Sequence, residues 1–116
     1  MTSRKTYIRE VARQLSGFLA TGSAEDLIAC LVAESNLPGP RANRDLAAAF
    51  ADAVREYAAA DENDCRALWS LCTELACVSP EDAPAGDPHE FLPLCGVLGI
   101  AAIGAVAPAF TGMALA

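Results

Sequence analysis

Apolar residues recur at every third or fourth position along much of the chain, which is the pattern of helices that bury one face. The first apolar stripe covers residues 8–19, and Gly22 follows it as a stop, because glycine readily takes the left-handed conformation that ends many helices. Ser23 is the expected N-cap of the next helix, whose apolar stripe covers residues 27–32. The pattern therefore predicts a first pair of helices over residues 5–36.

A second pair of helices is predicted after a loop that helices cannot enter. Residues 37–43 contain two prolines and a glycine, which break a helix. Asn43 and Asp61 are the expected N-caps of the third and fourth helices, because their side chains can accept hydrogen bonds from the first helical turn. Apolar stripes follow both caps and predict the second pair over residues 43–78.

A third pair is predicted after a second proline-rich loop. The sequence Asp-Pro-His-Glu at residues 87–90 has the acidic residues and the proline of a helix start. Pro93 has no backbone N–H to donate, so we expect the regular helix to begin near Phe91. A sixth helix is expected to begin at Pro108, which places the third pair over residues 88–116.

The three helix pairs start about 40 residues apart, which is the period of HEAT and armadillo repeats. Runs of alanine and leucine, with an aromatic content of only 6%, disfavour an all-β fold. We therefore expect one all-α domain over residues 1–116, in which antiparallel helix pairs stack as a HEAT-like α-solenoid. A six-helix bundle is the alternative, and the even spacing of the pairs favours the solenoid.

Three segments carry a resemblance to a known family. Leu-Pro-Gly-Pro-Arg-Ala-Asn at residues 37–43, the alanine-rich residues 46–54 and Glu-Phe-Leu-Pro-Leu-Cys-Gly at 90–96 resemble bacterial HEAT-repeat proteins. Those proteins are distantly similar to the DNA-alkylation-repair glycosylases built from HEAT-like repeats. The resemblance implies a right-handed stack of helix pairs and family members longer than this chain, which would hold the first three pairs of the array. The DNA-binding face of the glycosylases belongs to later repeats, past Ala116, so no catalytic residue is carried over.

Charge is distributed unevenly and argues against binding to nucleic acid. The chain has 15 acidic and 8 basic side chains and a net charge of −7. The first 60 residues balance, so the whole excess of acid lies between Asp61 and Glu90. Binding to nucleic acid depends mainly on neutralising phosphates, which an acidic protein does poorly. Arg41 and Arg44 in the first loop region are the candidate contacts for an anionic partner.

The 26 residues from Phe91 to Ala116 carry no charge, and two interpretations compete for them. The stretch is longer than the ~20 apolar residues that cross a bilayer, so a C-terminal membrane anchor is one interpretation. Two prolines, four glycines and the absence of flanking Lys or Arg disfavour the anchor. We favour an inner helix pair of the stack, in which Gly96, Gly99, Ala102 and Gly104 allow close helix packing.

That interpretation has a consequence for the end of the stack. The last helix pair has no outer neighbour, although solenoids need a polar cap there. We expect an exposed apolar end that binds a protein partner or a second copy, which would make the protein an oligomer. The candidate contact residues are Phe110, Met113, Leu115 and Trp69, although we favour a role in the core for Trp69.

Residues with catalytic or metal-binding chemistry are sparse. The five cysteines form no Cys-x-x-Cys motif, and His89 is the only histidine, so we expect packed thiols and no metal or cofactor. No apolar signal segment follows Met1, which favours a reducing, cytoplasmic setting. The acidic residues at 61–64 lack the glycine of a calcium loop and fit helix capping better.

These observations favour a non-enzymatic, HEAT-like scaffold or protein-binding module. Two alternatives remain open at this point: the N-terminal part of a HEAT protein related to DNA repair, and a tail-anchored helical membrane protein.

Overall fold

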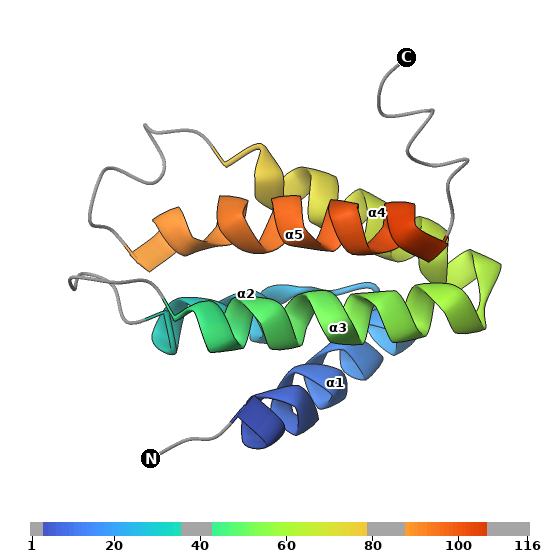
Figure 1. Cartoon of the computed structure of the whole chain (residues 1–116). Helices are drawn as coiled ribbons and strands as arrows, with labels where there is room; N and C mark the ends of the chain where they lie inside the picture. Colours follow the sequence, from blue (N-terminus) through green and yellow to red (C-terminus); the bar gives the residue numbers. More distant parts are fainter. Residues whose placement is uncertain (1–3, 36–42, 79–87, 107–116) are drawn as a thin grey trace.

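The computed structural model of the chain describes residues 4–35, 43–78 and 88–106, and within these ranges it contains helices and no strand (Figure 1). The prediction of an all-α protein is therefore confirmed. The helices are α1 (Arg4–Thr21), α2 (Glu25–Ala33), α3 (Arg44–Ala60), α4 (Glu62–Ala76), the short 3-10 helix η1 (Pro88–Glu90) and α5 (Phe91–Val106). The sixth helix predicted from Pro108 lies outside the described residues.

Three predicted helix ends have the expected local geometry. Gly22, directly after α1, has a φ of +78°, which is the left-handed conformation that glycine adopts without strain. The side chain of Asn43 accepts a hydrogen bond from the backbone N–H of Leu46 at 3.1 Å, and that of Asp61 accepts one from Asp64 at 3.0 Å. Both contacts satisfy a backbone donor that the first turn of a helix leaves unpaired.

The prediction that Ser23 caps α2 is wrong. The helix begins at Glu25, so Ala24 occupies the cap position, and it has no side-chain acceptor to offer. Ser23 belongs instead to the turn after α1, because its backbone N–H donates to the Thr21 hydroxyl at 3.2 Å. Its own hydroxyl accepts from the N–H of Glu25, the first residue of α2, at 3.5 Å.

The start of the fifth helix agrees with the sequence. The residues Pro88–Glu90 form the 3-10 turn η1, and the regular helix begins at Phe91. Pro93 therefore lies in the first turn of α5, where a missing backbone N–H breaks no helical hydrogen bond.

The core lies around α3, which has α1 on one side and α4 with α5 on the other (Figure 1). α5 packs along both α3 and α4, and it also contacts α2. Phe50 of α3 is fully buried at the centre of the contacting helices. The other large side chains that are almost completely buried are Val11, Leu15, Leu27, Leu31, Leu46, Val54, Leu68, Cys72, Phe91, Cys95 and Ile103.

A polar junction at Asn43 joins the first helix pair to the second. Its side-chain amide nitrogen donates to the hydroxyl of Tyr7 at 3.0 Å and to the carbonyl of Glu34 at 2.8 Å. Its backbone N–H donates to the carbonyl of Ser35 at 2.9 Å. Asn43 is only 6% exposed, so these hydrogen bonds replace those that water would otherwise supply.

Two glycines let α5 approach its neighbours closely, as the sequence predicts. A Cβ atom on Gly96 would overlap the backbone N of Ala76 and would lie 2.6 Å from the carbonyl oxygen of Cys72. A Cβ atom on Gly99 would overlap the Cys72 Sγ and would lie 3.2 Å from a ring carbon of Phe50. The glycine side of α5 therefore faces α4 and α3, and no larger residue fits at Gly96 without a shift of backbone.

Candidate interaction surface

The composition of α5 differs from that of every other described helix. Its sequence, from Phe91 to Val106, contains no charged, amide or hydroxyl side chain. Each of the other four α-helices carries charged residues, which occupy its solvent side. Whichever part of α5 is left uncovered by the core is therefore apolar.

Apart from Val106 at its last position, the uncovered part of α5 forms one continuous stripe. Leu94, Val97, Ala101 and Ala105 are all exposed, and their spacing of three or four residues places them along one face of the helix. We call these four residues the α5 stripe. Leu94 is 37% exposed and Val97 57%, and together with Val106 they are the exposed large hydrophobic residues of the described part of the chain. Isolated apolar residues are common on protein surfaces, whereas a contiguous apolar row is a candidate contact for a partner.

The α5 stripe partly corrects the expectation from the sequence. The apolar end expected at the sixth helix lies outside the described residues, whereas the fifth helix, which was expected to be an inner helix, leaves one face uncovered. A signal for this face was present in the sequence. Gly96 and Gly99 mark the closely packed side of the helix, so the residues opposite them are the ones left for solvent or for a partner.

The residues singled out from the sequence do not gather at one site in the described structure. Trp69 on α4 is half-buried and packs against the core, in keeping with the favoured interpretation. Arg44 is exposed at the first position of α3. The other candidates, Arg41, Phe110, Met113 and Leu115, lie outside the described residues.

The cysteines behave mostly as packed apolar residues, and none forms a disulfide. Burial raises the pKa of Cys72 to about 12, and burial together with the nearby Cys72 raises that of Cys95 to about 12. Both thiols therefore stay protonated at neutral pH, which makes them poor nucleophiles. Cys65 is also buried, and Cys30 is half-buried. The prediction of packing is wrong for Cys77, which is exposed at the end of α4.

The described surface also has an open hollow between the α1–α2 turn and α4. Its volume is about 370 Å³, and it is lined by Phe18, Leu19, Gly22, Ala24, Ala67, Ser70, Leu71 and Glu74. Glu74 is the one ionisable group among these lining residues, so no acid–base pair is formed there. Across the described residues, no three histidine, cysteine or acidic side chains come close enough together to hold a metal ion.

None of the described helices is long and apolar enough to cross a membrane. Comparisons with known proteins give no assignment: no protein family matches the sequence, and neither a curated protein nor a solved structure is similar to it.

Proposed function

We propose that this protein is a non-enzymatic helical module that binds another protein through the α5 stripe. The observation that carries the proposal is that the exposed large hydrophobic side chains of the described structure all belong to α5, a helix without a polar side chain. A partner that covers this face removes apolar surface from water, which contributes about 25 cal/mol for each Å² buried before the cost of association is subtracted. The other helices offer mixed charges at their surfaces, which favour contact with water.

The arrangement of the helices supports a scaffold role for the rest of the domain. We propose a HEAT-like stack, because α1, α3 and α5, the first helices of the three sequence pairs, contact one another in chain order. The contact between α2 and α5 supports the six-helix bundle instead, since a solenoid repeat contacts only its neighbours. In either arrangement α3 and α4 hold α5 from behind and present its opposite face.

Photo-crosslinking at the α5 stripe tests the proposed function. A benzophenone amino acid replaces Val97, which is 57% exposed, and in a matched control it replaces Ser16, which is exposed on α1. Irradiation of cells that make the protein should join position 97 to a discrete protein, identified by mass spectrometry, and should give no such product from position 16. Equal labelling at both positions, or none at position 97, would overturn the proposal.

A further inference from the structure

We propose that the partner of the α5 stripe is a second copy of this chain, and that two α5 helices pair antiparallel about a two-fold axis. This inference rests on the proposed function and names the partner that the function requires. It draws on three properties of the described residues: the charge of the molecule, the sizes of the side chains in the stripe, and the direction of α4 relative to α5.

Charge favours this face over the others for pairing between copies. Each copy carries a net charge of −7, so two copies repel each other in general. The α5 stripe is a described surface on which no charge has to lose its water when it is covered. A partner that fits the stripe must itself present an uncharged apolar face, and a second copy supplies one of the same length.

Side-chain size favours the antiparallel direction. The stripe begins with the large residues Leu94 and Val97 and ends with the small residues Ala101 and Ala105. In an antiparallel pair, Leu94 of one copy faces Ala105 of the other, so large residues fill the space left by small ones. A parallel pair would instead place Leu94 against Leu94 and would leave a gap between the alanines, which loses packing contacts.

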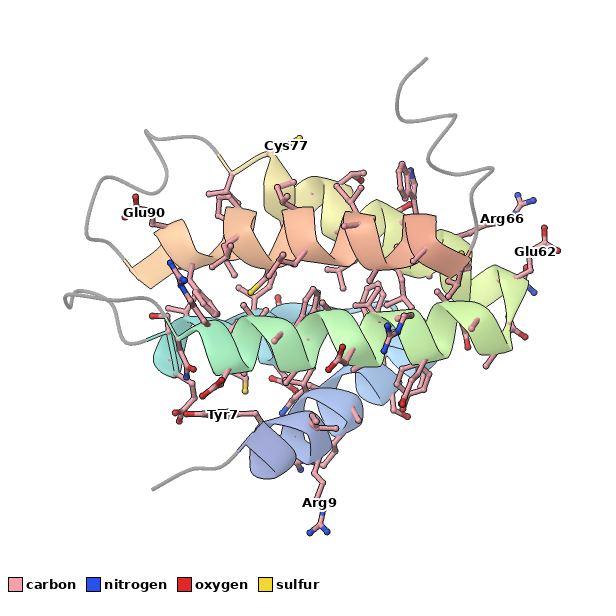
Figure 2. All side chains as sticks on the ribbon, in the orientation of Figure 1. Tyr7, Arg9, Glu62, Arg66, Cys77 and Glu90 are labelled. Carbon is pink, nitrogen blue, oxygen red and sulfur yellow. The ribbon has the colours of Figure 1, made fainter. Side chains whose placement is uncertain are left out.

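The charged residues at the two ends of α5 favour the same direction. Gly96 lies against Ala76 and Gly99 against Cys72, so α4 runs antiparallel to α5. Arg66, which pairs with Glu62 at 3.4 Å, therefore lies toward the C-terminal end of α5, whereas Glu90 lies just before its start (Figure 2). Parallel pairing would bring two Glu90 side chains together, and antiparallel pairing separates them and opposes the two helix dipoles.

The size of the stripe indicates a weak dimer. A helix of 16 residues is about 24 Å long and about 10 Å wide, so one face offers on the order of 250 Å² from each copy, which is about 500 Å² in total. Interfaces below about 1,200 Å² in total are typical of transient association. We therefore expect a dimer whose population depends on protein concentration.

Sedimentation of the full chain over a series of concentrations tests the pairing. The dimer fraction should rise with protein concentration, and it should rise further from about 0.05 M to about 0.5 M salt, because salt screens the repulsion between two acidic copies. Val97→Glu should weaken the dimer at least about tenfold, because the new carboxylate would be buried without a partner. Ser16→Glu adds the same charge on α1 and should weaken the dimer much less. Circular dichroism checks that both variants are folded.

The outcomes separate this inference from the proposed function. If the protein is a monomer at every concentration and position 97 crosslinks to a different protein, the inference of a second copy is overturned, but the proposed function is supported. A monomer without any crosslink would overturn both. A dimer that both substitutions weaken equally would show that general charge, and not the α5 stripe, controls the association, and would overturn the inference.

Cysteine crosslinking tests the direction of pairing. The exposed Cys77 is first replaced by serine, and cysteine is then introduced as Ala101→Cys or, in a matched variant, as Leu94→Cys. Oxidation by copper phenanthroline should join two copies through position 101, which lies near the two-fold axis. It should not join them through position 94, because eleven residues of helix, about 16 Å, separate the two positions along the axis. Linkage at both positions would indicate parallel pairing, and linkage at neither would overturn the inference.

Discussion

At the scale of single residues, Asn43 shows how one side chain serves two purposes. Its side-chain oxygen caps α3 by accepting from the N–H of Leu46, while its nitrogen donates to Tyr7 and to the carbonyl of Glu34. The capping role was predicted from the sequence, because a cap contacts a backbone group only three residues away. The link to Tyr7, 36 positions earlier in the chain, depends on how α1 packs against α3 and was not predicted.

Replacing Asn43 tests both roles together. We expect Asn43→Ala to lower the free energy of unfolding by about 2 kcal/mol, because it removes the cap and takes away the partner of a part-buried carbonyl and hydroxyl. Urea denaturation measures the change. Asn63→Ala is the matched control, because Asn63 is exposed in the first turn of α4, and there the change should stay within about 0.5 kcal/mol. Similar losses in both variants would show that the junction adds no stability.

At the scale of elements, α5 is the helix whose placement the glycines decide. Four helices have polar residues that mark their outer face, so their orientation follows from the sequence pattern. α5 has no such mark, and only the close contacts of Gly96 and Gly99 with α4 and α3 determine which face is covered. The same contacts leave Leu94 and Val97 uncovered on the opposite side.

Substitution of Gly96 should change the free energy of unfolding in the opposite direction to substitution of an exposed glycine. Gly96→Ala should lower the free energy of unfolding by about 2–3 kcal/mol, since the methyl group would collide with the backbone of α4. Gly17→Ala, in the exposed face of α1, should raise it by about 0.5–1 kcal/mol, because nothing lies within 4 Å of the added atom and alanine is the better helix former. Urea denaturation of both variants measures the difference, and a neutral Gly96→Ala would contradict the close packing of α5 on α4.

At the scale of the whole molecule, the buried thiols connect stability to pH. Folding raises the pKa of Cys72 and of Cys95 from the ordinary value of 9.0 to about 12. Below pH 9 the thiols are protonated in both states and contribute no pH dependence. Between pH 9 and pH 12 the unfolded chain releases these protons and the folded chain retains them, so stability falls as pH rises.

The loss of stability above pH 9 gives a measurable slope of the free energy of unfolding against pH. Above pH 9, each of the two thiols should lower the free energy of unfolding by about 1.4 kcal/mol per pH unit until the folded form also ionises. Urea denaturation at a series of pH values measures the slope. Cys72→Ala should flatten the slope, whatever its effect on stability at pH 7, while Cys77→Ala, at an exposed position, should leave it unchanged. An unaltered slope in Cys72→Ala would contradict the assignment to the buried thiol.

Sequence pattern alone predicts the approximate positions of the five described α-helices, the stop at Gly22 and the caps at Asn43 and Asp61. These features depend on hydrogen bonds and side-chain periodicity within a few residues, so the local sequence is sufficient to predict them. The shift of the α2 cap away from Ser23 shows the limit of such prediction, since the backbone N–H of Ser23 is held in the turn after α1 by the Thr21 hydroxyl and the helix begins one residue later than expected.

The covered face of α5, and therefore the place of the candidate interaction surface, follows from how the helices pack together. A helix without polar residues gains by burying any of its faces, so the clearest mark of a side in its sequence is the pair of glycines, Gly96 and Gly99. The close approach of α3 and α4 determines which face of α5 is buried, because these helices leave space for glycine at positions 96 and 99 but not for a larger side chain.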